Sequence, residues 1–197
     1  EELASFSPNG ELVAFVREQN LYVVDLAAQA ERALTTDGGG PVFNGKADWV
    51  YYEEVLLRRR QTYWWSPDST RIAFLRLDDG PVHKFAVTDL IPTRQRVETT
   101  PYPKAGDPNP RASLGIASVA GGQVRWADRG NYSEDASLIV RVGWTPDSQD
   151  VCYYVQDRAQ TWLDFCRVSR EGGAPRCLFR ETTKAWVDDP GEPAFLR

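Results

Sequence analysis

The sequence has little or nothing of several features that would indicate binding to a metal ion, a membrane or a nucleic acid. It contains no methionine and a single histidine, His83, and none of its apolar runs is long enough to cross a bilayer. Its formal net charge is −5, so the basic surplus that nucleic acids and anionic membranes require of a partner is missing. The sequence has one histidine and no further group of metal-ligating side chains close to its adjacent acidic residues. We therefore expect no metal ion and no other cofactor. We also expect no nucleic-acid partner.

A nucleophilic serine motif is absent as well. No Gly-x-Ser-x-Gly turn, which carries the nucleophile of α/β-hydrolases, occurs in the chain. His83 has no serine that the sequence identifies as its partner. We therefore expect no catalytic residue here and no hydrolysis of peptides by this chain alone. The missing initiator methionine and the apolar run at 194–197 also indicate a fragment of a longer protein, in which another domain would supply the chemistry.

One pattern occurs three times in a chain that is otherwise rich enough in apolar residues, at 42%, to form a packed core. It consists of an aromatic residue, a Ser/Thr-Pro-Asp/Asn turn and a short apolar strand. Proline fixes the φ angle in such a turn, and Asp or Asn accepts local backbone hydrogen bonds. The three copies occupy residues 6–15, 65–74 and 144–153.

Further strand candidates follow each copy, so the pattern predicts a repeated four-stranded unit. These candidates lie at 20–26, 83–89, 161–169 and 176–179. Because one such sheet cannot bury both faces, neighbouring sheets must stack, as they do radially in a β-propeller. The sequence therefore predicts an all-β fold, a partial β-propeller spanning 1–197. Its blades are expected at 3–36, 43–125 and 137–182, with the next blade starting at 185–197. A compact β-sandwich is the alternative.

Two adjacent carboxylates, Glu53 and Glu54, lie in an aromatic stretch at residues 48–55, DWVYYEEV. Neighbouring side chains on a strand point to opposite faces, so both can reach one ligand only from a helical or irregular backbone. Residues 51–60 favour a short helix, which would be inserted in a blade and carry both carboxylates off the sheet. Two carboxylates suit a primary ammonium, which has three donors and one positive charge. The alternative is a solvated acidic pair neutralised by the three arginines that follow at 58–60.

Two of the three cysteines flank a predicted hairpin turn almost symmetrically. Cys166 and Cys177 enclose the turn residues 171–174 and would face each other across two strands, within reach of a disulfide. The alternative is a pair of ordinary strand cysteines. Cys152 is expected to stay free and buried.

Five stretches together resemble the propeller region of dipeptidyl peptidase IV and its bacterial relatives, in the prolyl oligopeptidase family. The double-glutamate stretch at 48–55 resembles that family's motif most closely. The other four lie, in the order expected, at 64–69, 101–110, 158–160 and 183–187. The resemblance covers the chain from about Leu3 to Arg197.

That resemblance implies a propeller placed over an α/β-hydrolase domain, which this chain does not contain. The family consists of serine peptidases that remove N-terminal dipeptides with proline or alanine second. By motif position, Glu53 and Glu54 would bind the substrate α-ammonium, while the propeller gates access to the active site. Tyr52 stands where the family often has a third acidic residue. Expected partners are peptides with a free N-terminus, the hydrolase domain, and further copies of the protein. The insertion at 91–112 would either pack against the neighbouring blade or form a contact between subunits.

Two other functions are consistent with the same pattern. A non-catalytic family member would keep the propeller as a binding module, and a TolB-like scaffold would have no ammonium site. The resemblance is closer to bacterial members, which predicts a periplasmic or secreted protein. A disulfide between Cys166 and Cys177 would agree with that location.

Overall fold

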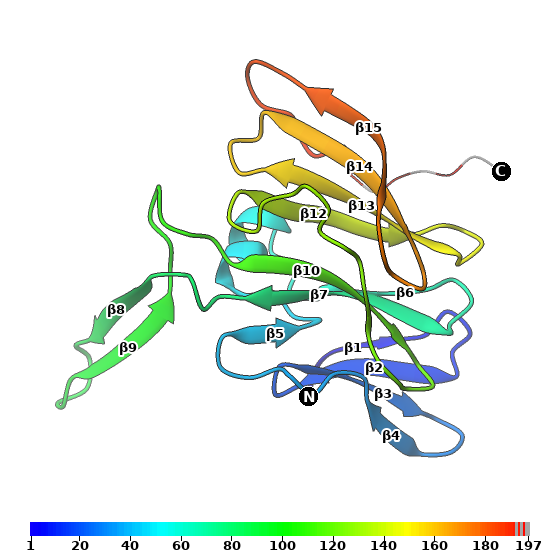
Figure 1. Ribbon diagram of the computed structural model, residues 1–197. Coiled ribbons are helices and arrows are strands. Elements are labelled where there is room, and N and C mark those ends of the chain that lie inside the picture. Colours follow the sequence, from blue (N-terminus) through cyan, green and yellow to red (C-terminus); the bar gives the residue numbers. More distant parts are fainter. Residues whose placement is uncertain (192, 194, 196–197) are drawn as a thin grey trace.

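Three antiparallel sheets lie side by side in the computed structural model, which describes residues 1–191, 193 and 195 (Figure 1). The first sheet consists of four strands in chain order: β1 (Glu2–Phe6), β2 (Leu12–Arg17), β3 (Asn20–Asp25) and β4 (Ala30–Ala33). The third sheet repeats this simple meander. Its strands are β12 (Ser137–Trp144), β13 (Asp150–Asp157), β14 (Trp162–Ser169) and β15 (Arg176–Thr182).

The middle sheet is less regular because two insertions interrupt it. Its order is β11-β10-β7-β5, and a fifth strand, β6, also pairs with β7. The bounds are β5 (Val42–Asn44), β6 (Tyr63–Trp65), β7 (Arg71–Asp78), β10 (Arg111–Ser118) and β11 (Arg125–Trp126). Between β5 and β6 the chain forms η1 (Tyr51–Val55), a single π-helical turn.

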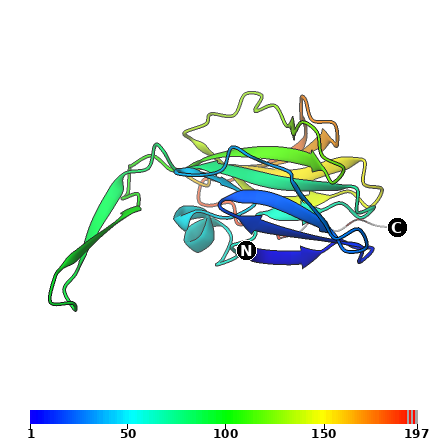
Figure 2. The ribbon, with the colours of Figure 1, turned by 90° about the horizontal axis from the view of Figure 1, so that it is seen from below.

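The strand predicted at 83–89 is present, but its predicted place in the middle sheet is wrong. It forms β8 (Lys84–Asp89), which pairs only with β9 (Arg96–Pro101) in a separate two-stranded arm. The place beside β7 is taken by β10, which pairs with β7 over its full length. Both views show the arm projecting away from the three sheets (Figures 1 and 2). All six residues of β8 are exposed, so no core residue holds this strand against the sheets.

The three repeated turns form a hydrogen-bonded ladder between neighbouring sheets. In the second copy, the Ser66 hydroxyl donates to the Asp68 carboxylate at 2.6 Å, as the turn chemistry predicts. The Asp68 backbone N–H then donates to Oγ of Ser148 in the third copy, at 3.0 Å. The Asn9 backbone N–H donates in the same way to Oγ of Ser69, at 3.1 Å. Sequence repetition thus becomes a repeated contact between sheets.

Apolar side chains fill the two spaces between neighbouring sheets. The larger cluster joins the second and third sheets and includes Tyr51, Leu75, Leu114, Val142 and Tyr153. The other joins the first and second sheets and includes Val16, Leu21, Tyr63 and Phe74. Because every sheet packs against its neighbour through a face, removing one sheet would expose the apolar face of the next.

The predicted start of a further blade at 185–197 is only partly described. Its described residues contain no strand, and residues 192, 194 and 196–197 lie outside the described part. Within the described chain, none of the helical segments has the length and apolarity needed to cross a membrane.

Candidate functional site

The residues that precede the glutamate pair fix where the π-helical turn begins. The Asp48 carboxylate is buried and accepts hydrogen bonds from the backbone N–H groups of Val50, at 2.9 Å, and Tyr51, at 3.1 Å. Free N–H groups at the start of a helix need such acceptors. Burial raises the pKa of Asp48 above its ordinary value, although these two hydrogen bonds oppose the shift.

Tyr51 attaches the turn to the third sheet. Its side chain is fully buried, and its hydroxyl oxygen accepts a hydrogen bond from the backbone N–H of Ile139 in β12, at 3.1 Å. Burial also raises the pKa of the Tyr51 hydroxyl, so it stays protonated. The π-helical turn is therefore inserted between two strands of the middle sheet but is hydrogen-bonded to the third sheet.

The turn ends abruptly, which keeps it short. Leu56 N donates to Tyr51 O at 2.8 Å, the spacing of a π-helix, and the next two residues, Leu57 and Arg58, have φ angles of +50° and +66°. A left-handed backbone at residues other than glycine stops a helix. The helix predicted over 51–60 therefore covers only Tyr51–Val55. Single π-turns are frequent at functional sites.

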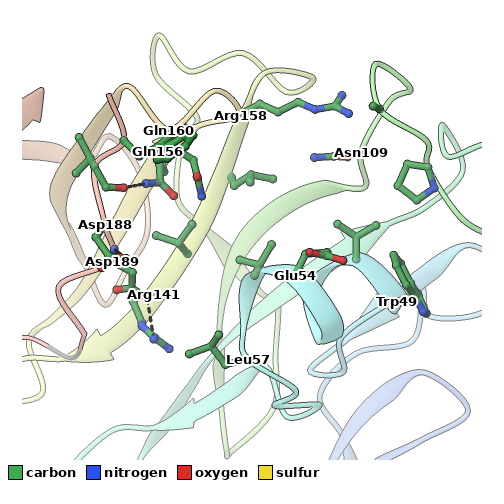
Figure 3. A pocket seen from close by; sticks show the side chains of 18 of the residues that line it. Trp49, Glu54, Leu57, Asn109, Arg141, Gln156, Arg158, Gln160, Asp188 and Asp189 are labelled. Atoms are coloured by element: carbon green, nitrogen blue, oxygen red, sulfur yellow. Dashed lines mark hydrogen bonds and ion pairs between the residues drawn. The ribbon is translucent and has the colours of Figure 1, made fainter. Parts of the chain in front are cut away.

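The two glutamates have different surroundings on this turn. Glu53 is half-buried, and its carboxylate forms an ion pair with Nε of Arg58 at 3.3 Å. Glu54 is exposed and lines a cavity, into which its side chain points in Figure 3. No described residue forms an ion pair or hydrogen bond with the Glu54 carboxylate. The available carboxylate is therefore that of Glu54, and Glu53 does not line the cavity.

The cavity has a volume of about 1000 Å³ and opens between η1 and one end of the third sheet (Figure 3). Its walls come from η1 and the residues on either side of it, from the loop after β9, from β12 and β13 with the turn after β13, and from the segment after β15. The polar, charged and aromatic side chains of its lining include Trp49, Glu54, Tyr102, Asn109, Arg141, Gln156, Arg158, Gln160, Trp186 and Asp189.

Aromatic side chains form one side of this cavity. The rings of Trp49 and Tyr102 lie 4.4 Å apart, and the Phe85 ring at the base of the arm lies 6.1 Å from Tyr102. Trp186 lines the cavity with an exposed indole. In the sequence, Tyr102 lies in the insertion at 91–112 and in the family stretch at 101–110, and neither pattern predicts a role for its side chain. Only the fold shows that Tyr102 meets Trp49.

The remaining predicted residues lie outside the cavity. Cys166 and Cys177 are register partners on β14 and β15, and all three cysteines are free thiols in the structure. The predicted disulfide therefore stays a prediction. Cys152 is buried, and His83 is exposed at the base of the arm. Among the described residues, no group of histidine, cysteine and acidic side chains could hold a metal ion.

Comparison with known proteins identifies the family. The family model described as "Dipeptidyl peptidase IV (DPP IV) N-terminal region" matches residues 1–197. The chain belongs to this family. A curated relative, dipeptidyl aminopeptidase B of Saccharomyces cerevisiae, is 36% identical over 151 residues, which are 72% of this chain and 18% of that protein. The chain thus spans less than a fifth of the length of this relative.

Solved structures agree with the assignment to dipeptidyl peptidase IV N-terminal regions. The crystal structure of Porphyromonas gingivalis dipeptidyl peptidase 4 matches with a TM-score of 0.86 and 29% identity, over 94% of this chain and 26% of that one. A structure from Bacteroides ovatus, 21% identical, has a TM-score of 0.79 over 94% of this chain and 25% of that chain, a likeness in fold alone. The resemblance and the all-β, propeller-type fold predicted from the sequence are confirmed.

Family membership also gives the cavity a sequence signature. Of the five stretches that carried the resemblance, four contribute residues to its walls: 48–55, 101–110, 158–160 and 183–187. The fifth, 64–69, belongs to β6 and the turn after it. Motifs that lie more than a hundred residues apart in the chain therefore meet at one place in the fold.

Proposed function

We propose that this chain is the propeller part of a serine dipeptidyl peptidase and that its cavity receives the free N-terminus of a peptide. The observation that carries the proposal is the convergence of four family stretches on one cavity lined by the unpartnered Glu54 carboxylate. The proposed substrates carry proline or alanine as their second residue. The hydrolytic residues belong to the α/β-hydrolase domain, so the chain alone is inactive.

Glu54 is the principal ligand of the substrate α-ammonium in this proposal. A peptide α-amino group has a pKa of about 8, so it is mostly protonated at neutral pH. Each charge-assisted hydrogen bond to a carboxylate contributes about 1.5–3 kcal/mol. An N-acetylated peptide has no positive charge to offer, so Glu54 selects free N-termini. Because the ammonium is then fixed, the distance to the scissile bond is fixed too.

Glu53 has a second, conditional role. Its ion pair with Arg58 is weak, because the Arg58 side chain is 76% exposed and solvent screens the two charges. A bound ammonium can therefore compete with Arg58 for Glu53, and the second carboxylate then joins Glu54. Before a peptide binds, the positive charge of Arg58 reduces the repulsion between the adjacent carboxylates of Glu53 and Glu54.

The test uses the complete protein that contains this chain, with Glu54→Gln, Glu53→Gln and, as a matched control on the arm, Glu98→Gln. The substrates are a chromogenic Xaa-Pro amide and its N-acetylated form. We expect the wild type to prefer the free amine, and Glu54→Gln to lose about 2–5 kcal/mol of transition-state stabilisation on it. Glu53→Gln should lose less, and the control nothing.

Two outcomes would assign the chain another function. A complete protein that binds free-amine peptides without cleaving them is a binding module of the same family. A protein that ignores both acetylation and Glu54→Gln is a propeller scaffold of the TolB type, without an ammonium site. Activity of the isolated chain would contradict the assignment of catalysis to another domain.

We further propose that the protein forms homo-oligomers through the arm of β8 and β9. This hairpin is isolated from the sheets, and an isolated two-stranded hairpin is barely stable in water. Its apolar residues are nevertheless exposed, with Ile91 at 96% and Val97 at 65%. A second copy of the chain would cover these side chains and support the hairpin.

A further inference from the structure

A second charged side chain, Arg158, lines the cavity on the side formed by the turn after β13. Figure 3 shows it across the cavity from Glu54, with its side chain extended toward Asn109. In the sequence, this arginine stands out only as part of the family stretch at 158–160. Its surroundings in the fold give it a chemistry of its own.

The backbone that carries Arg158 is firmly held. Its own N–H donates to Ala136 O at 3.0 Å, before β12 begins. The Asp157 carboxylate closes the turn, because it accepts hydrogen bonds from Thr161 N at 2.7 Å and Trp162 N at 2.9 Å. The Arg158 side chain therefore starts from a well-defined point on the cavity wall, and its guanidinium is free to turn toward a ligand.

The segment after β15 is fastened to the same turn. Val187 N donates to Gln160 O at 2.7 Å, and the buried Gln156 side chain donates back to Val187 O at 2.8 Å. The turn after β13 and the segment after β15, which both line the cavity, are thus joined by hydrogen bonds. The backbone of Arg158 therefore belongs to a firmly held part of the cavity wall.

Each of the other charged side chains that line the cavity has a contact within the chain, including Asp188, whose carboxylate accepts a hydrogen bond from Asp189 N at 2.9 Å. Arg141 forms an ion pair with Asp189 at 2.6 Å, and Lys104 lies over the Phe85 ring, with its Nζ 5.3 Å from the ring centroid. In the described part of the chain, the Arg158 guanidinium has neither an ion pair nor a side-chain hydrogen bond. The cavity therefore presents one unpartnered carboxylate, Glu54, and one unpartnered guanidinium on different walls.

We propose that Arg158, with the Asn109 amide that lines the same cavity, is an anion subsite that selects peptides with an acidic side chain close to their N-terminus. The proposal rests on the proposed function, because Glu54 holds the α-ammonium of the same peptide. A guanidinium offers two parallel N–H donors to a carboxylate, and an amide can add a third. The substrate class is thus a peptide with a free N-terminus and an aspartate or glutamate among its first residues.

The acidic residue must stand at the position in the peptide that matches the distance between the Glu54 carboxylate and the Arg158 guanidinium. An extended peptide advances about 3.3–3.6 Å per residue, so the acidic residue that binds best measures how far Arg158 lies from Glu54 along the substrate. A residue at the first position would have both its charges inside the cavity. A residue at the third or fourth position would bind with the chain extended across it.

The experiment uses the complete protein and pairs of free-amine peptides with proline second. Within each pair, glutamate and glutamine alternate at the first, third or fourth position. We expect the wild type to favour glutamate about tenfold or more at one of these positions, in both Kd and kcat/KM, as expected of one charge-assisted hydrogen bond. Arg158→Gln should abolish this preference and leave the glutamine peptides unaffected. Arg158→Lys should restore only part of it, because lysine lacks the planar fork.

Arg176→Gln is the matched control, because Arg176 is an exposed arginine on β15 that does not line the cavity. Equal treatment of glutamate and glutamine at all three positions would overturn the proposal. A glutamate preference that survives Arg158→Gln, or an equal loss on both peptides of a pair, would overturn it as well. Failure of the ammonium site is seen separately, as indifference to acetylation and to Glu54→Gln. Kd values keep the test valid for a protein that binds without cleaving.

Discussion

The hydroxyl oxygen of Tyr51 accepts a hydrogen bond from the backbone N–H of Ile139, 88 residues further along the chain, at 3.1 Å. Ile139 lies in β12, an edge strand of the third sheet, so this N–H lacks a strand partner on that side. The bond therefore satisfies an edge group and fastens the π-helical turn of Glu53 and Glu54 to the neighbouring sheet. One contact thus positions the carboxylates and joins two sheets.

Tyr51→Phe should test this contact. It leaves the Ile139 N–H without its acceptor in a partly buried place, so we expect a loss of about 1–2 kcal/mol in the free energy of unfolding by urea. It should also raise KM for free-amine substrates, because the turn that carries Glu54 loses an anchor. Tyr52→Phe is the control, since the Tyr52 ring contacts Arg60, a contact that phenylalanine keeps. Equal stability of the two variants would contradict the role of Tyr51.

Asp79 should make stability depend on pH. Burial, reinforced by the charges of Asp48 and Asp78 and opposed by Lys84, raises the pKa of its carboxyl to about 6. An unfolded aspartate titrates near pH 3.9. The folded protein thus holds the proton to higher pH, so this contribution is complete below about pH 4 and is lost as pH rises through 6. The loss is on the order of 2–3 kcal/mol.

Asp79→Asn is the matching experiment. Asparagine carries no charge to bury, so the variant should be more stable than the wild type at pH 7, and the difference between the two should shrink toward pH 4. Urea unfolding at several pH values measures this difference. Glu98→Gln, on the exposed arm, should leave the pH profile unchanged. A constant difference from pH 4 to 7 would show that Asp79 titrates normally.

The arm should control self-association. Ile91→Asp or Val97→Asp places a charge on its exposed apolar surface, and burying an unpaired charge at an interface is costly. We expect either change to convert a homo-oligomer into a monomer in sedimentation velocity, with the unfolding free energy of the sheets unchanged. Thr100→Asp, whose side chain points to the other face of the same strand, is a control for charge alone. A monomeric wild-type protein at high concentration would rule out this interface.

Oxidation should join Cys166 and Cys177. They are register partners on β14 and β15, and burial raises the pKa of the Cys166 thiol to about 12, so the exposed Cys177 is the thiol that reacts first. We expect thiol titration in denaturant to fall from three groups to one after mild oxidation. Closing this short loop should add about 3 kcal/mol of stability. Cys177→Ser should prevent both effects.

The same titration bears on the compartment. We propose a periplasmic or secreted location, where a disulfide of this kind persists. Protein isolated from such a compartment should already contain the bond. Three free thiols in that material would count against both the bond and the location.

Local patterns predicted much of the architecture. The Ser/Thr-Pro-Asp/Asn turns predicted their own hydrogen bonds and the strands that follow, since these depend on residues close together in the chain. Residues 83–89 were predicted correctly as a strand and placed in the wrong sheet. The same alternating pattern suits any partner strand, and the partner of β7 is decided by which segment returns beside it, namely β10.

The candidate site was predicted only in part. Glu53 and Glu54 were found because they are adjacent and resemble a family motif, and the helical turn beneath them was expected. The sequence could not show that Glu53 pairs with Arg58 while Glu54 faces the cavity, because π-helical geometry and the left-handed residues after it decide the two directions. Arg158 was found only as part of the family stretch at 158–160, and its charge gained a meaning only from what lies across the cavity.

The sequence by itself determined the family, the all-β class and the turn chemistry, because these follow from short motifs and nearest-neighbour preferences. The tertiary structure alone decided which motifs meet. Stretches at 48–55, 101–110, 158–160 and 183–187 come together only when the sheets stack and bury their apolar faces, and that packing energy is shared among residues far apart in the chain. It sets an unpartnered carboxylate opposite an unpartnered guanidinium.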